Sequence, residues 1–357
     1  MPFYSRIKHR KPAERRRTAQ NILKLQEALD DGPRQYRCEG NLVIGTWNIR
    51  HFGSDIRQDE ALHYIAEVIA AFDVVALQEV KSDLEHLKDV MKLLGPGWDY
   101  IVTDVTAGKS GNSERQAFVF DTRTVRFTNE VGEIVLPEGQ EIVGQNSKTE
   151  GKEGKFQFAR TPFMVSFQSG WFKFNLCTVH MYFGKGKQGV LHRTNEIKAV
   201  AEFFGDRNKK DNPNILLGDF NIIKPQDATM KALTDGGYTI PDDIASIPEE
   251  FRNGKFYDQI AFPTQGHDDK FRFRNGGVVR MFETVYRQDK WQDYRSILEE
   301  RKIENAGSRE EADLIDASLE SYFRVHWRTY QMSDHLPLWV AMKTDFSQEY
   351  LQEIAND

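Results

Sequence analysis

Short apolar runs alternate with longer segments of helical spacing along the 357 residues of the chain. Helices are predicted where apolar residues recur every three or four positions, at 12–30, 59–72, 83–94 and 188–207. Strands are predicted at the apolar runs 42–47, 73–77, 100–103, 116–120, 124–127, 161–167, 172–179, 214–217, 256–262 and 336–342. Because these elements do not follow a regular strand–helix–strand repeat, they favour an α/β (α+β) sandwich of packed layers over a doubly wound sheet.

Two segments depart from this pattern. The polar, glycine-rich stretch 137–154 is predicted to be a loop. The stretch 263–332 is predicted to hold a strand at 278–286 and helices at 291–303 and 309–323. We interpret this second stretch as an elaboration inserted before the last core strand.

Composition limits the classes of protein that the chain can belong to. A hydrophobic fraction of 39% and a charged fraction of 29% are those of a soluble protein with a sizeable core. The sequence contains no apolar run long enough to span a bilayer and no apolar stretch behind the basic N-terminus that would form a secretory signal. Only two cysteines are present, which favours a reducing compartment and a cytoplasmic protein.

The formal net charge of −6 hides an uneven distribution. Residues 1–40 carry 10 Lys/Arg against 5 Asp/Glu, whereas the remainder carries 38 against 49. A basic N-terminal extension could contact a polyanion, and an ordinary solvated helix explains the same pattern equally well. The acidic remainder is what a metal site built from carboxylates would require.

Polar side chains recur where the predicted apolar strands end. They are Asn48, Glu79, His180, Asp219, Asn221, Asp258, Asp334 and His335. A single such residue is usually a turn or helix cap. Capping does not explain why carboxylates, amides and imidazoles arrive together at equivalent strand ends, where active sites tend to lie.

This mixture of side chains fits metal-assisted hydrolysis of a phosphate ester. Asn48, Glu79 and Asp334 offer the oxygen ligands that Mg²⁺ prefers, with Mn²⁺ or Ca²⁺ as alternatives. Zinc would require more histidine or cysteine ligands. Histidines that carry a proton near neutral pH suit contact with a phosphate and its leaving group. Together these groups indicate in-line attack of water on a phosphoester.

Six segments, in this order, resemble the endonuclease/exonuclease/phosphatase superfamily: TWNIRHFG (46–53), VVALQEV (74–80), TVH (178–180), LLGDFNI (216–222), YDQI (257–260) and SDHLPL (333–338). As an ordered set they are highly specific. Within the superfamily the chain is most similar to deoxyribonuclease I, also over 112–120 and 158–163. The resemblance implies a four-layer α/β/β/α sandwich of two mixed β-sheets flanked by helices. It also implies one catalytic domain at 41–343, with an extension at 1–40 and a tail at 344–357.

The resemblance also implies roles for individual residues. Asn48, Glu79 and Asp334 would bind the divalent metal, and Asp219 and Asn221 would lie against the scissile phosphate. Either Asp219 or His335 would activate the attacking water.

Other roles concern proton transfer and substrate binding. His180 and His335 would face the phosphate, with Glu114 orienting the first and Asp258 the second. Arg160, Lys81 and Arg50 would contact the substrate.

The resemblance is weaker for substrate than for chemistry. Compared with deoxyribonuclease I, the segment around Glu114 is shorter, and the 263–332 insertion and the basic extension have no counterpart. We expect an endonuclease that acts on DNA. The basic-aromatic stretch 270–277 could hold phosphates and stack on bases, or it could be an ordinary amphipathic strand with solvated arginines.

Three alternatives remain open at this point. RNA, a phospholipid such as sphingomyelin, or an inositol phosphate could replace DNA, with Trp171 as the one modest candidate for a membrane contact. A binding module without activity is also conceivable, although every expected polar position is occupied. His267, Asp268 and Asp269 could form a second metal site, but solvated charge is the more common reason for such a run.

Overall fold

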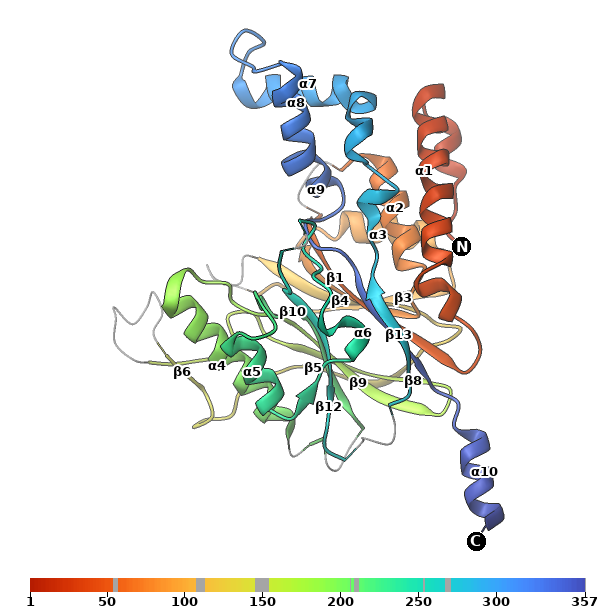
Figure 1. The fold of residues 1–357 in the computed structure, drawn as a ribbon, viewed down its shortest axis with the longest axis vertical. Coiled ribbons are helices and arrows are strands. Elements are labelled where there is room, and N and C mark those ends of the chain that lie inside the picture. The colour runs from red at the N-terminus through yellow and green to blue at the C-terminus, as the bar shows by residue number, and fades with distance from the viewer. Residues whose placement is uncertain are drawn as a thin grey trace.

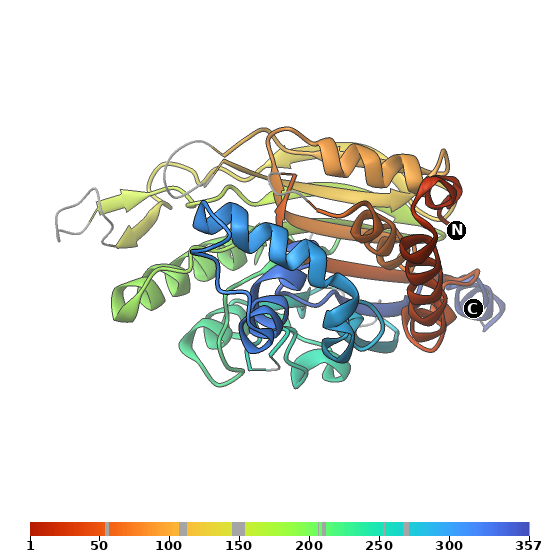
Figure 2. The same cartoon turned by 90° about the horizontal axis from the view of Figure 1, so that it is seen from above.

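The chain folds around two β-sheets that pack face to face and carry helices on their outer sides (Figures 1 and 2). The computed structural model describes residues 1–53, 57–106, 113–144, 154–205, 207–208, 212–252, 254–266 and 271–356. The first sheet runs in the order β13 (Phe273–Val278), β14 (Leu338–Lys343), β1 (Asn41–Phe52), β2 (Val74–Lys81), β4 (Glu114–Asp121) and β3 (Trp98–Val102). The second runs β11 (Tyr238–Thr239), β12 (Asp258–Pro263), β10 (Asn214–Asp219), β9 (Phe172–His180), β8 (Phe163–Ser169) and β5 (Arg126–Glu133). The predicted four-layer fold is therefore confirmed.

Three apolar clusters hold the layers together. The central cluster joins the inner faces of the sheets, where Ile44, Phe118 and Phe167 are among its buried members. The helices of the first sheet, α1 (Pro12–Asp30), α2 (Asp59–Ile69) and α3 (Glu85–Leu94), pack on its outer face. The second sheet is covered by α4 (Gly186–Gly205) and α5 (Ala228–Asp235). Strands buried on both faces explain why their sequences are continuously apolar.

Strand direction brings six strand ends to one place. β1 and β2 are parallel, and so are β9 and β10, so each pair ends at the same edge of its sheet. β14 and β12 run antiparallel to β1 and β10 and therefore begin at that edge. Asp219 is directly opposite both His180 and Asp258 in the ladder. The polar residues that the sequence places at strand ends consequently gather at one edge of the sandwich.

The insertion differs from its prediction in one element. The apolar run 278–286 is not a strand: the edge strand β13 ends at Val278, and a short 3-10 helix, η3, follows at Met281–Glu283. Met281, Val285 and Tyr286 are buried in the cluster beneath the helices, so they are apolar for helix packing and not for a sheet. The expected helices are present in altered form, as η4 (Gln288–Tyr294), α7 (Arg295–Ala306), α8 (Asp316–Tyr322), the π-helix η5 (Phe323–Trp327) and α9 (Arg328–Gln331).

Two further predictions need correction. The stretch 137–154 is not wholly a loop, because β6 (Ile142–Gly144) pairs with β7 (Gly154–Phe156). The tail contains a helix, α10 (Ser347–Asn356), and α5, α6 (Asp242–Ala245) and the 3-10 helices η1 (Ser5–His9) and η2 (Pro33–Tyr36) were not predicted. The division into extension, catalytic domain and tail stays a prediction. Over the described ranges, no helix is both long enough and apolar enough to cross a membrane.

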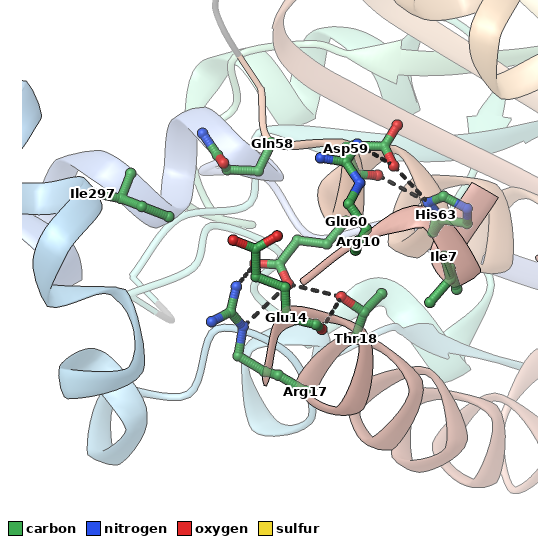
Figure 3. A pocket seen from close by; sticks show the side chains of 10 residues that line it. All are labelled: Ile7, Arg10, Glu14, Arg17, Thr18, Gln58, Asp59, Glu60, His63 and Ile297. Carbon is green, nitrogen blue, oxygen red and sulfur yellow. Dashed lines mark hydrogen bonds and ion pairs between the residues drawn. The ribbon is translucent and has the colours of Figure 1, made fainter. Parts of the chain in front are cut away.

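The basic N-terminal extension is bound to the body by ion pairs. Five of its arginines contact acidic residues elsewhere in the chain: Arg6 with Asp89, Arg10 with Asp59, Arg17 with Glu60, Arg34 with Glu67, and Arg37 with Asp73 and Asp121. Figure 3 shows Glu60 of α2 pointing toward Arg17 and Thr18 of α1, beside a small cavity of about 30 Å³. Much of the positive charge of the extension thus serves internal pairing.

Candidate active site

Asn48 and Glu79 form an oxygen-rich corner at the ends of β1 and β2. The amide of Asn48 donates to Glu79 Oε1 at 3.2 Å and to Asp219 Oδ2 at 3.0 Å, while the backbone N–H of His51 donates to Glu79 Oε2 at 3.0 Å. Glu79 and His51 both have left-handed backbone angles, with φ of 60° and 45°, where the β1–β2 register is interrupted. These strained positions bring the backbone N–H of His51 to the Glu79 carboxylate, and such strain is common at functional sites.

The donor set at this corner fits a divalent cation. Asn48 Oδ1 is buried and, within the described residues, accepts no hydrogen bond. A buried oxygen without a partner is costly unless a cation or a ligand completes it. The oxygens of Glu79 lie beside it, and a hard cation such as Mg²⁺ prefers oxygen ligands.

Asp334 reaches the same corner from the start of β14. The hydroxyl of Ser333 donates to the carbonyl of Asn48 at 2.6 Å, which fixes the neighbouring Asp334 against the end of β1. Arg50 Nη1 lies 3.7 Å from Asp334 Oδ2 and donates to Thr329 Oγ1 at 2.8 Å, and its guanidinium is 3.8 Å from the ring centre of Tyr330. The insertion therefore supplies the residues that hold Arg50 beside Asp334.

His180 lies between two carboxylates. Its Nδ1 is 3.1 Å from Glu114 Oε2, and its Nε2 is 3.5 Å from Asp219 Oδ2. Asp219 also accepts the backbone N–H of Asn221 at 2.8 Å, and the Asn221 amide donates to the carbonyl of Met181 at 2.8 Å. Asn221 has a φ of 54°, which folds the chain back so that this amide lies beside β9.

Glu114 is held by three cationic or imidazole groups. Arg160 Nε donates to Glu114 Oε2 at 2.9 Å and Lys81 Nζ to Glu114 Oε1 at 3.4 Å, in addition to the His180 contact. Burial favours the neutral acid, but His180, Arg160 and Lys81 outweigh it and hold the pKa of Glu114 well below its usual range. Arg160 and Lys81 therefore reach the site, where both contact Glu114.

His335 faces a pair of buried carboxylates. Its Nδ1 is 3.1 Å from Asp258 Oδ1 and 3.7 Å from Glu249 Oε1, and Glu249 Oε1 also accepts the backbone N–H of Asp258 at 2.6 Å. Burial raises the pKa of both Asp258 and Glu249. Burial alone would lower the pKa of His335, but Asp258 and the other nearby carboxylates outweigh it and raise that pKa well above the usual value.

Glu249 is a site residue that the sequence did not reveal. It precedes the β12 strand by nine positions and enters the site because the segment carrying it lies against β14, where its carbonyl accepts the N–H of Leu336 at 2.8 Å. Its sequence context, Ile-Pro-Glu-Glu-Phe, indicates only a turn. One ligand atom each from Asp219, Asp258 and His335 lies within 4.8 Å of the others, which makes this group a second place that could hold a metal.

The twelve predicted site residues form three groups of contacting residues: Asn48, Glu79, Lys81, Glu114, Arg160, His180, Asp219 and Asn221; Arg50 and Asp334; and Asp258 and His335. The pairing of β10 with β12 and the hydrogen bond from Ser333 to Asn48 bring the three groups to one edge of the sandwich. Two other sequence candidates lie elsewhere. Arg272 and Arg274 are exposed at the end of β13 that pairs with Met342, away from the active-site end of β14, so the amphipathic-strand explanation holds for them. His267, Asp268, Asp269 and Lys270 lie outside the described residues.

A sandwich of two sheets with carboxylates, amides and histidines at their shared edge defines a class of metal-dependent phosphoesterases. The Endonuclease/Exonuclease/phosphatase family model matches residues 45–294, and the chain belongs to this family. The specific likeness to deoxyribonuclease I stays a prediction. No curated protein matches the chain in sequence.

Solved structures share the fold at low sequence identity. A family protein from Bacteroides thetaiotaomicron has a TM-score of 0.52 at 18% identity, covering 86% of this chain and 96% of that one. A humanized TDP2 from D. rerio has a TM-score of 0.54 at 14% identity, covering 86% and 100%. The human Nocturnin catalytic domain with bound sulfate has a TM-score of 0.52 at 13% identity, covering 86% and 95%.

Proposed function

We propose that the protein is a divalent-metal-dependent phosphodiesterase, and specifically an endonuclease that hydrolyses DNA. The observation that carries the proposal is the pairing of His180 with Asp219 and of His335 with Asp258 beside the oxygen-rich corner at Asn48. Metal-assisted hydrolysis of a phosphodiester needs these parts together: oxygen ligands, proton donors and a group that activates water.

Each group has a distinct task in this proposal. Asn48, Glu79 and Asp334 would hold the cation, which would stabilise negative charge on the phosphate. His335, whose pKa the nearby carboxylates raise above its usual value, is the candidate proton donor to a phosphate oxygen. Asp219 accepts hydrogen bonds from Asn48 and from the backbone of Asn221, and it is the candidate base for the attacking water.

Glu114 and Asp258 complete the proposal as positioning residues. Each lies 3.1 Å from the Nδ1 atom of its histidine, which leaves the Nε2 atom of each ring for the reaction, and the Nε2 atom of His180 lies 3.5 Å from the candidate base Asp219. Arg160 and Lys81 contact Glu114, and Arg50 is held on Tyr330 near Asp334. These cations would balance part of the charge of a bound phosphate.

Local charge supports a nucleic acid as the substrate. Two segments beside the site, 251–257 and 321–333, contain no Asp or Glu although the chain is acidic overall. They carry Arg252, Arg324 and Arg328, none of which pairs with a carboxylate in the described part of the chain. The backbone N–H of Phe251 donates to the carbonyl of Asp334 at 3.0 Å, so these segments adjoin the site.

Among these cations, Arg328 gives the strongest support for a bound phosphate. Its guanidinium lies 4.5 Å from the ring centre of Phe282, and burial together with nearby Arg324 lowers its pKa to about 10. A partly buried cation without an acidic partner is what a phosphate would neutralise. A protein of the same fold, TDP2 from D. rerio, has been solved with a single-strand DNA product.

The lipid alternative has less support. Trp171 is exposed and packs on Tyr350, but it lies in the β8–β9 turn, at the opposite end of β9 from His180. A membrane contact there would hold the active site away from the lipid. RNA and small phosphate esters, including inositol phosphates, keep their place as alternative substrates.

Cleavage of supercoiled plasmid tests the proposal directly. We expect nicking with Mg²⁺ or Mn²⁺ that EDTA abolishes and that the His180→Ala protein lacks. Hydrolysis of a bis-aryl phosphodiester without cleavage of plasmid would retain the chemistry and reject DNA. Failure to hydrolyse either substrate with Mg²⁺ or Mn²⁺ would reject the phosphodiesterase itself.

A further inference from the structure

An aromatic step leads from His335 to the surface of the protein. The Tyr257 ring packs beside His335, with ring centres 5.4 Å apart and planes tilted by 32°. Phe183 stands edge-on to Tyr257, at 6.3 Å and 85°. Tyr257 is half-buried, whereas Phe183 is 46% exposed. An exposed phenylalanine is common on protein surfaces, but this one is separated from a candidate catalytic histidine by a single ring.

The loop that carries Phe183 is tightly closed. Gly184 has a left-handed φ of 53°, and a Cβ atom on Gly189 would lie 2.3 Å from the carbonyl carbon of Gly184. The Gly189 N–H also donates to the carbonyl of Lys185 at 3.3 Å. Because the two glycine backbones touch, no larger residue fits at Gly189 without opening the loop. The close contact between Gly184 and Gly189 thus fixes the backbone next to Phe183.

A buried arginine holds this loop from below. Arg193 of α4 is almost fully buried, donates from Nη1 to the carbonyl of Phe183, and lies 5.3 Å from the Phe183 ring centre. Within the described residues, no carboxylate forms an ion pair with it. Burial of an unpaired guanidinium is unfavourable, which indicates that the position it maintains has a use.

A second buried residue links the loop to the Arg160 segment. Glu196 Oε2 accepts the backbone N–H of Tyr182 at 2.8 Å, and Glu196 Oε1 accepts that of Ala159 at 2.7 Å. Arg193 and Glu196 lie one turn apart on α4, so one helix positions both Phe183 and the neighbour of Arg160. The position of the Phe183 loop is therefore fixed relative to the Arg160 segment of the active site as well as to α4.

We propose that Phe183 is a stacking platform for a nucleobase next to the scissile phosphate. This inference rests on the phosphodiesterase proposed above and names the part of its substrate that the site recognises. A phosphate facing His335 would place an adjoining nucleotide over the Tyr257–Phe183 step, and aromatic rings bind bases of any sequence by stacking. Lys185 of the same loop and Lys187 in the first turn of α4, both exposed, suit the phosphates that flank such a base.

Two fluorescent thymidine octamers test the platform. Both contain a single cleavable phosphodiester linkage, and all their other linkages are phosphorothioate. One octamer has all its bases, and the other lacks the two bases that flank the cleavable linkage. We expect the protein to bind the first about tenfold more tightly in EDTA, as measured by fluorescence anisotropy. Phe183→Ala should remove this preference and Phe183→Trp should retain it. Leu191→Ala, which truncates another exposed apolar residue nearby on α4, should behave as the wild type.

The outcomes separate the platform from the proposed function. Equal affinity of the wild type for the two octamers overturns the platform, as does a base preference that survives Phe183→Ala. Cleavage of the intact octamer is then measured with Mg²⁺. A base preference in binding without any cleavage supports the platform and contradicts the phosphodiesterase, whereas cleavage without a base preference does the reverse. If the protein binds phosphatidylcholine vesicles in a way that depends on Phe183, and binds the octamers without such dependence, the nucleobase assignment is also overturned.

Discussion

Two of the clusters of buried polar side chains, one at the strand ends and one between α1 and α2, differ in how fully their carboxylates are paired. In the helix cluster, both oxygens of Glu60 accept bonds from Arg17, at 3.2 and 3.3 Å, and Thr18 adds a third at 3.1 Å. In the strand-end cluster, one oxygen each of Asp258 and Glu249 and the Asn48 Oδ1 atom lack any partner among the described residues. The carboxylate of the first cluster is fully paired, whereas the carboxylates of the second leave oxygens for a ligand.

The pKa directions alone would not separate the two clusters. Burial raises the pKa of Glu60 even beside Arg17, just as it raises that of Asp258. The unpaired oxygens make the distinction, because an internal ion pair satisfies its own atoms and a binding site leaves some for the ligand. We therefore expect changes in the helix cluster to reduce stability and changes in the strand-end cluster to reduce activity.

The largest expected effect is on the rate after Asp219→Asn. This nearly isosteric change removes the candidate base and should lower the rate of phosphodiester hydrolysis by about 10³–10⁴-fold, which corresponds to roughly 4–5.5 kcal/mol in the barrier. The melting temperature should stay the same or rise, since one of several converging carboxylates loses its charge. Rates on the bis-aryl diester and thermal melts of the same preparation check both parts. A fall in melting temperature with an unchanged rate would contradict the assignment.

The next effect is on stability after Glu60→Ala. The change leaves Arg17, whose side chain is 17% exposed, without its carboxylate partner. We expect the free energy of unfolding to fall by about 3–5 kcal/mol, because an unpaired charge then remains buried. Urea denaturation measures it, and the rate per folded molecule should not change. Asp30→Ala is the matched control. The Asp30 side chain is 60% exposed, so its ion pair with Arg34 should contribute less than about 1 kcal/mol to the free energy of unfolding.

Metal binding should distinguish the clusters by a smaller amount. Mg²⁺ at about 100 times its dissociation constant should stabilise the protein by about 2.7 kcal/mol, because it binds the folded state alone. Calorimetric melts with Mg²⁺ and with EDTA measure this shift. Glu79→Gln should abolish it and Glu60→Gln should leave it intact. If the shift survives Glu79→Gln but is lost in Asp258→Asn, the cation belongs to the Asp219–Asp258–His335 group.

The sequence predicted the residues that lie at strand ends better than those that reach the site through tertiary packing. Asp219 and His180 follow apolar runs whose ends meet whenever parallel strands pair, so local pattern was sufficient. Glu249 lies in a turn and Arg193 in the middle of a helix, and nothing nearby in sequence indicates their burial. Their positions depend on which segment packs against β14 and which face of α4 points inward.

The insertion shows the same limit for the fold. Its apolar run 278–286 has the composition of a strand, yet Tyr286 packs against Tyr64 and Trp327 in the helix layer. The true edge strand lies earlier, where Phe271 and Phe273 alternate with exposed arginines and pack on Phe262. Period alone identifies an alternating strand, but a continuous apolar run does not specify its partner.

Glu114 is the intermediate case between the clusters, and its pH dependence gives the smallest expected effect. Although it lies in the active site, Arg160, Lys81 and His180 surround it as Arg17 and Thr18 surround Glu60. Its pKa is lowered below the unfolded value of about 4.3, so its stabilising contribution is present above that pH and is lost as the pH falls through the folded pKa. Each unit of lowering corresponds to about 1.4 kcal/mol. The stability difference between the wild type and Glu114→Gln should therefore be largest above about pH 5 and shrink toward pH 3 in urea denaturation. Parallel stability curves over that range would show that Glu114 is not stabilised as a carboxylate.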